Sequence, residues 1–175
     1  EDAVARIRQG MKVMLRLGSA WFDVAAGVKA ITELGLDPRH FLFCTDDMHP
    51  GTLLHEGHID RVLRHAIAQV LKPMTALQMM TINTAEHFGV SADVGQIAPG
   101  RYADIVLASS LPEFRAELVI AAGEVIVENG AWQIDLPAFE YPADVKYSVH
   151  IGKTITPADF VVPAPGAGAH ATANV

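Results

Sequence analysis

The sequence predicts an α/β fold with a small β appendage, and three observations lead to that class. Two short apolar runs, residues 11–15 and 40–45, are typical of buried strands. Between them, residues 22–34 carry apolar side chains at helical spacing, which gives the strand–helix–strand rhythm of a parallel sheet. After residue 93 the pattern changes to short β segments separated by turn residues.

Glycines, turn residues and aspartates mark the ends of the first predicted segments. Residues 1–9 predict a short helix that Gly10 ends, and the first strand runs into the turn at residues 16–19. Gly35 stands where a C-terminal glycine cap belongs after the helix at 22–34. The second strand, at 40–45, ends at Asp46 and Asp47.

The later segments divide the chain into three expected parts. Helices are predicted at 59–71 and from Pro73 to about residue 88, and β segments at 94–97, 105–108, 118–121 and 124–127. Beyond Asp135 there are five prolines, and residues 163–169 resemble a linker of small residues. We therefore expect barrel-type β/α units at 1–93, a β part at 94–135 and an extended linker-like segment at 136–175.

Charge and cysteine content exclude several classes of protein. The chain has 175 residues, with 13 Lys and Arg against 20 Asp and Glu, so nucleic acid and anionic membrane surfaces are not expected partners. The single cysteine, Cys44, excludes an internal disulfide framework and a cysteine zinc cluster. No apolar run reaches about 18 residues, so we expect no membrane span, and a cytoplasmic location.

The candidate site lies at the end of the second strand. Asp46 follows an apolar strand directly, at the place where parallel α/β folds carry catalytic groups. A carboxylate there can ligate a divalent metal or take a proton from a metal-bound water. The alternative is that Asp46 or Asp47 merely N-caps the next turn. Four histidines, at 55, 58, 65 and 87, lack the HExxH spacing of a zinc site and fit a solvated face better.

Two stretches together resemble a known superfamily. Residues 73–90 read PMTALQMMTINTAEHFGV, and residues 95–107 read GQIAPGRYADIVL. This pattern is similar to the C-terminal signature of the amidohydrolase superfamily. The resemblance implies the last part of a TIM-like (β/α)8 barrel, followed by a small flanking β-sandwich.

A second set of motifs is narrower. Residues 14–20 read MLRLGSA, residues 44–50 CTDDMHP and residues 55–60 HEGHID, and together they resemble the bacterial adenine deaminases. Matches to that family run from residue 1 to about residue 160. The resemblance implies metal-dependent hydrolysis of adenine to hypoxanthine and ammonia. The implied cofactor is a divalent metal, manganese or iron, with zinc as an alternative.

The resemblance also implies roles for individual residues. Asp46 matches the carboxylate that ends the eighth strand, which ligates metal and moves the proton between water and purine. From their positions, Asp47 and His49 are expected at the rim of the substrate pocket. Arg16 and Ser19 are expected to line the substrate site from the seventh strand.

The rest of the superfamily's ligand set has no counterpart in the chain. The HxH pair of the first strand and the middle-strand ligands would lie upstream of Glu1, and a barrel needs about 200 residues or more. The expected partners are therefore adenine, the remainder of the barrel from the same protein and further copies in a homo-oligomer. Two rivals stay open: another cyclic amidohydrolase, dihydroorotase- or deacetylase-like, and a non-catalytic fragment that needs a complementing chain.

Overall fold

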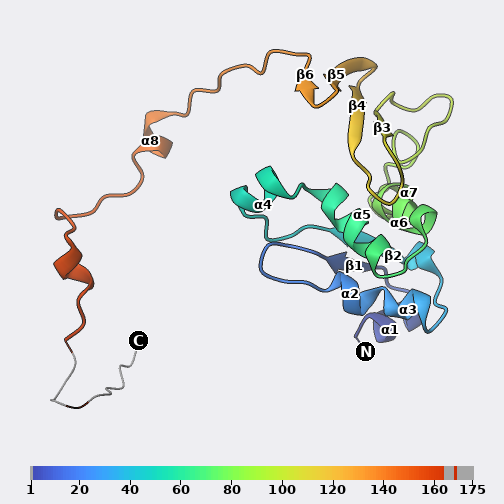
Figure 1. Ribbon diagram of the computed structural model, residues 1–175, viewed down its shortest axis with the longest axis horizontal. Coiled ribbons are helices and arrows are strands. Elements are labelled where there is room, and N and C mark those ends of the chain that lie inside the picture. The colour runs from blue at the N-terminus through green and yellow to red at the C-terminus, as the bar shows by residue number, and fades with distance from the viewer. Residues whose placement is uncertain (1, 164–167, 169–175) are drawn as a thin grey trace. The chain divides into compact units, whose positions relative to one another are not determined.

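The computed structural model describes residues 2–163 and residue 168. The chain divides into two compact units, Glu1–Asp135 and Leu136–Val175. Figure 1 shows the first unit as a pair of strands with helices and a separate meander of strands. Most of the expected linker at 163–169 lies outside the described residues.

Two parallel strands form the centre of the α/β part. β1 (Val13–Arg16) pairs with β2 (Phe41–Cys44), with Val13 opposite Phe41 and Arg16 opposite Cys44. The apolar runs at 11–15 and 40–45 therefore form strands as predicted. Parallel strands have their carboxyl ends at one edge, so the residues that follow β1 and β2 are brought together.

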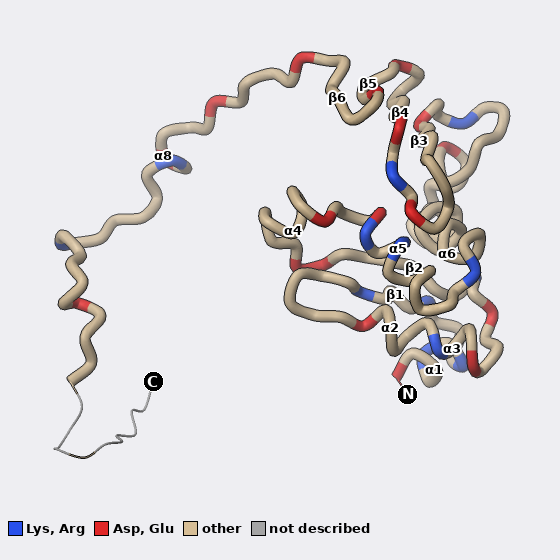
Figure 2. The backbone as a smooth tube through the Cα atoms, viewed as in Figure 1, with Lys and Arg blue, Asp and Glu red and all other residues tan. Residues whose placement is uncertain are grey.

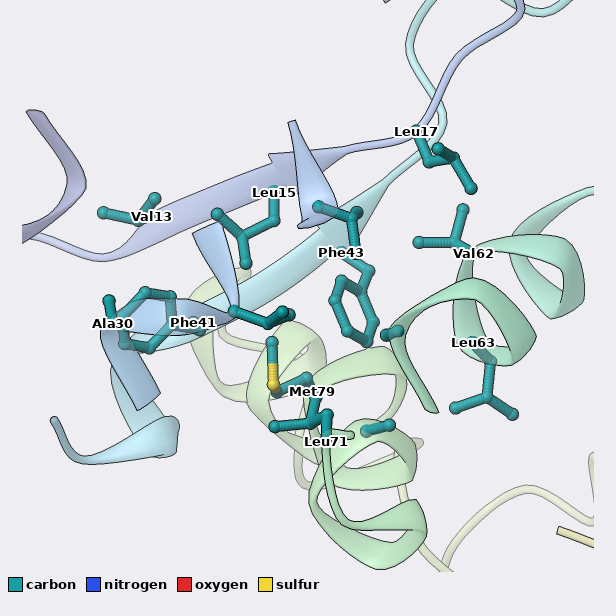
Figure 3. Close-up of a cluster of buried hydrophobic side chains, with 14 residues drawn as sticks. Val13, Leu15, Leu17, Ala30, Phe41, Phe43, Val62, Leu63, Leu71 and Met79 are labelled. Atoms are coloured by element: carbon teal, nitrogen blue, oxygen red, sulfur yellow. The ribbon is translucent and has the colours of Figure 1, made fainter. Parts of the chain in front are cut away.

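Alternation along the strands decides which side chains enter the core. Val13 and Leu15 of β1 and Phe41 and Phe43 of β2 are buried, and they belong to the same hydrophobic cluster as Leu63 and Met79 (Figure 3). Met14 and Arg16 alternate with them and are partly exposed. One face of the sheet thus packs on helices, and the other carries Arg16 to the carboxyl edge.

The helices of the α/β part are short. They are α1 (Asp2–Arg8), α2 (Val24–Gly27), α3 (Lys29–Thr32), α4 (Pro50–His55), α5 (Ile59–Ala68), α6 (Pro73–Met80) and α7 (Ile82–His87), with a 3₁₀ turn, η1 (Pro38–His40), before β2. The single helix predicted at 22–34 is divided into α2 and α3 at Val28. The helix predicted from Pro73 is divided at Thr81, whose hydroxyl donates to the carbonyl of Leu77 over 2.7 Å. Such a bond back to the preceding turn competes with regular helix geometry.

The β part is an antiparallel meander of four strands. β3 (Ile105–Ala108), β4 (Ala116–Ala121), β5 (Glu124–Glu128) and β6 (Ala131–Trp132) pair in sequence order. The predicted strand at 94–97 is wrong, because Gly95 has a φ of +98° and residues 91–96 form turns and bends. That glycine backs onto α7, where a Cβ would lie 2.6 Å from the Cβ of Ala85.

The second unit has little regular structure among its described residues. It contains α8 (Ala143–Lys146) and a 3₁₀ turn, η2 (Pro157–Phe160), with extended chain between them. Its described side chains are exposed, including Phe139, Tyr147 and Phe160. No helix of the described residues is both long and apolar enough to cross a membrane.

Candidate functional site

The candidate site lies where β1 and β2 end. Arg16 is the last residue of β1, and Asp46 stands two residues beyond the end of β2. The backbone N–H of Leu17 donates to the carbonyl of Cys44 over 3.1 Å, which continues the pairing past the strands. Charged residues of both signs lie along this part of the chain (Figure 2).

Arg16 and Asp46 form a direct ion pair. The Nη1 atom of Arg16 lies 2.8 Å from Oδ2 of Asp46. Asp46 has a φ of +58°, the left-handed conformation that Asp and Asn adopt more readily than most residues. The hydrogen bond to Asp46 is the main cause that raises the pKa of the Arg16 guanidinium, so this cation stays charged at any working pH.

A second carboxylate holds the other side of Arg16. Asp23 accepts from Nε of Arg16 over 3.0 Å, and Nη2 lies 2.8 Å from the same oxygen. The ring of Trp21 lies 5.5 Å from Cζ of Arg16, within cation–π range. Asp23 was not among the site residues predicted from the sequence, and it lies seven residues from Arg16 across a loop.

The other three predicted residues gather in the two loops beside this pair. Ser19 Oγ accepts from the backbone N–H of His49 over 2.8 Å and bonds Oγ1 of Thr52 over 2.9 Å. Asp47 accepts the N–H of Ala20 on its carboxylate and the N–H of Ser19 on its carbonyl, each over 2.6 Å. The loops after β1 and β2 are therefore bonded to each other.

The structure tests the capping interpretation of the aspartates. His49, not an aspartate, stands at the N-terminal cap of α4, and no side-chain capping bond is formed there. The alternative that Asp46 or Asp47 caps this helix is therefore wrong. Asp47 instead joins the loops, which leaves Asp46 as the carboxylate that faces β1.

Cys44 and Arg61 also lie beside the candidate site. Burial, and after it the negative charge of Asp46, raises the pKa of the Cys44 thiol, so Cys44 is unsuited to act as a thiolate nucleophile. Arg61 donates from Nη1 to the carbonyl of Gly18 over 2.9 Å and pairs with Glu56 over 2.6 Å. Arg61 was also not predicted from the sequence, and it fixes the loop after β1 from the side of α5.

Two hollows open on this unit. One, of about 480 Å³, is lined by the two loops, including Ser19, Asp47 and His49. A larger one, of about 960 Å³, lies among α6, α7 and β3 and has a mostly apolar lining. Both linings are mostly apolar, and the smaller hollow is the one that includes three of the residues predicted for the site, next to Asp46 in sequence. Both volumes lie in the range of small-molecule sites.

The residues present do not suffice for a metal centre. Within residues 2–163 and residue 168, no group of three or more His, Cys, Asp and Glu is placed to hold a metal ion. Asp46 supplies a single carboxylate, and one of its oxygens already binds Arg16. Any metal bound at this edge would therefore need further ligands beyond the described residues.

Comparison with known families decides the relationship. A model of the amidohydrolase family matches residues 3–130. The chain belongs to the amidohydrolase family. Among solved structures, the fold resembles a β-aspartyl dipeptidase from Fervidobacterium islandicum AW-1, with a TM-score of 0.61, 20% identity and coverage of 79% of this chain and 38% of that one. It also resembles enamidase, with a TM-score of 0.55, 21% identity and coverage of 74% and 37%.

The amidohydrolase chain also has curated relatives of much higher identity. Adenine deaminase 3 of Rhizobium meliloti (strain 1021) is 57% identical over 166 residues, which cover 95% of this chain and 28% of that protein. Adenine deaminase of Roseobacter denitrificans is 53% identical over 174 residues, covering 99% and 29%. The chain thus spans less than a third of the length of these relatives.

Proposed function

We propose that the protein carrying this chain hydrolyses adenine to hypoxanthine and ammonia. The observation that carries the proposal is the identity of half or more to proteins named adenine deaminase, across nearly all of this chain. The position of Asp46 at the carboxyl edge of β1 and β2 supports it, since catalytic groups of parallel α/β folds lie at that edge.

We further propose that β1 and β2 are the last two strands of a TIM-like (β/α)8 barrel. In this proposal residues 1–93 are the final β/α units, 94–135 a part of a flanking β-sandwich and 136–175 a linker-like segment. The parallel pairing of β1 and β2, with helices packed on one face, supports the barrel assignment. The remainder of the barrel is then the partner of this chain, in a cytoplasmic homo-oligomer.

Asp46 is the residue to which we assign proton transfer. Water attacks the carbon that bears the amine of adenine, a C–O bond forms, and the C–N bond breaks as ammonia leaves. Asp46 accepts one proton of the attacking water and passes it to a ring nitrogen. It then accepts the second proton, from the hydroxyl that the water has become, and passes it to the amine, which leaves as ammonia. One carboxylate serves both transfers when it lies within hydrogen-bond reach of each group. Ser19, Asp47 and His49 remain the proposed substrate-binding residues, whereas Arg16, predicted from the sequence for the same role, bonds Asp46 over 2.8 Å.

The cofactor that we propose is a divalent metal, manganese or iron, with zinc as the alternative. Asp46 would contribute one carboxylate ligand, and the other ligands would have to come from residues outside this chain. Manganese and iron accept such oxygen and imidazole ligands.

A chimeric enzyme tests the proposal. In the chimera, this chain replaces the aligned segment of Adenine deaminase 3 of Rhizobium meliloti. We expect the purified chimera, supplied with manganese, to release ammonia from adenine and not from dihydroorotate or an N-acetylated sugar. A folded chimera that acts on a cyclic amide or an acetamide would favour the rival amidohydrolases. A folded chimera without activity, beside an active Rhizobium enzyme, would favour the non-catalytic alternative.

A further inference from the structure

The guanidinium of Arg16 binds two carboxylates at the same time. Its Nη1 lies 2.8 Å from Asp46, while Nε and Nη2 lie 3.0 and 2.8 Å from Asp23. The ring of Trp21 lies 5.5 Å from Cζ of Arg16, so a cation–π contact adds to the two ion pairs. A guanidinium is planar and rigid, so fixing its Nε edge on Asp23 also fixes the direction in which Nη1 donates.

This arrangement is poorly suited to a purely stabilising role. The side chains of Asp23 and Asp46 are 56% and 57% exposed, and exposed ion pairs contribute little to the free energy of unfolding. The same bonds do determine where the Asp46 carboxylate points. The bond from Arg16 occupies Oδ2 of Asp46. Within residues 2–163, Oδ1 of Asp46 makes no hydrogen bond or ion pair.

We infer that Arg16 and Asp23 are positioning residues for the catalytic carboxylate, which rests on the function proposed for Asp46. Asp23 orients Arg16, and Arg16 holds Oδ2 of Asp46 so that Oδ1 faces the reacting groups. Arg16 then acts through Asp46 and not by touching adenine. The loop from Gly18 to Asp23 is fixed as well, because the N–H of Asp23 donates to the carbonyl of Arg16 over 2.8 Å.

Asp23→Asn in the chimera is the first test. The substitution keeps the size of the side chain and removes the charge that holds the Nε edge of Arg16. We expect kcat for adenine to fall about 10- to 100-fold, the effect typical of groups that orient a catalytic residue, with KM changed less than about twofold. The matched control is Asp37→Asn, which removes another arginine-paired carboxylate, 2.9 Å from Nε of Arg39, away from the site. Equal kcat values for the two variants would overturn the inference.

Arg16→Ala separates positioning from substrate binding. If Arg16 acts through Asp46, guanidinium ion added at a non-denaturing concentration restores part of the kcat that Arg16→Ala loses. The Arg16→Lys variant recovers less of it, because an ammonium group cannot donate to two carboxylates in the fixed planar geometry of a guanidinium. A rise in KM at unchanged kcat would instead show that Arg16 binds adenine directly. That result would contradict the inference and support the role predicted from the sequence.

A structural measurement keeps the inference testable if the chimera lacks activity. Crystal structures of the Asp23→Asn and Asp37→Asn chimeras would be compared at Arg16. We expect the contact between Arg16 and Asp46 to be lost or rotated only in Asp23→Asn. An unchanged contact in that variant would refute the positioning role, whereas an inactive folded parent chimera would refute only the proposed function.

Discussion

Gly18 lies in the loop after β1, directly against the loop after β2. A Cβ built on it would lie 1.8 Å from Oδ1 of Asp47 and 2.9 Å from the Asp47 carbonyl oxygen. The backbone N–H groups of Ser19 and Ala20 also donate to Asp47, so the aspartate has little freedom to move away. The absence of a side chain at residue 18 is therefore a condition for the bonded pair of loops.

Gly18→Ala in the chimera should destabilise this edge by about 1–3 kcal/mol, the usual cost of overpacking a filled position. Gly51→Ala is the matched control: Gly51 lies in α4, and a methyl group added there would meet no described atom within 4 Å, so the helix should gain about 0.5–1 kcal/mol. The midpoints of chemical denaturation measure both effects. A Gly18→Ala midpoint equal to that of the parent would contradict this close packing of the loops.

Some residues of the candidate site could be predicted from the sequence, and others could not. Asp46 was predicted because an apolar strand ends immediately before it, and the structure places it at the strand edge beside Arg16. Asp23 could not be predicted, because its contact with Arg16 depends on the turn of the intervening loop. Arg61 was missed for a related reason, since its partners are backbone carbonyls of a distant loop.

At the scale of elements, η1 and β2 show how a short turn fixes the start of a strand. Asp37 accepts the N–H of Arg39 over 3.0 Å at the N-terminal cap of η1, and β2 begins at Phe41. Hydrogen bonds from Arg39, first from its side chain and then from its backbone, lower the pKa of Asp37 from 3.8 to about 2. Asn83 adds bonds to the carbonyls of Pro38 and Phe41, over 2.9 and 3.0 Å.

The lowered pKa of Asp37 predicts a pH dependence of stability. Between about pH 4 and pH 2 the unfolded carboxyl binds the proton that the folded one rejects, so stability falls as the pH falls through this window. Asp37→Asn removes that contribution while an asparagine can still cap η1. We therefore expect the denaturation midpoint of the chimera to fall more steeply with acid than that of its Asp37→Asn variant. Parallel curves between pH 4 and pH 2 would contradict the assignment.

Local pattern predicted most elements but not where helices are interrupted. The strand pair, α5 and the β4–β5 hairpin correspond to segments predicted from apolar spacing and turn residues. The break at Thr81 depends on a side-chain bond to the backbone, which periodicity does not encode. The absence of a strand at 94–97 depends on the approach of Gly95 to α7, a tertiary contact.

At the scale of the whole molecule, the described sheet leaves much unpaired. β1 and β2 form a sheet of two strands, each with one edge that no other described strand pairs. Near their carboxyl ends Trp21 and Phe22 are 63% and 55% exposed. Two-stranded sheets gain stability from further strands or packing, so these surfaces agree with the proposal that more of the barrel adjoins them.

Family membership is shown by sequence similarity, whereas the catalytic role of Asp46 is a proposal. The amidohydrolase relationship covers residues 3–130 and follows from sequence similarity over many positions. The role of Asp46 rests on one carboxylate, its strand-end position and its bond to Arg16. Measured turnover of adenine tests that proposed role.

The most direct measurement is the rate of adenine deamination by the chimera that carries Asp46→Asn. Asparagine tolerates the φ of +58° at this position, so the fold should persist, as circular dichroism would verify. We predict a loss of kcat of at least about 10²- to 10⁴-fold, the contribution of a general acid–base group, while Asp37→Asn retains the activity of the parent. Activity above a few per cent of the parent in a folded, metal-supplied Asp46→Asn chimera would contradict the account.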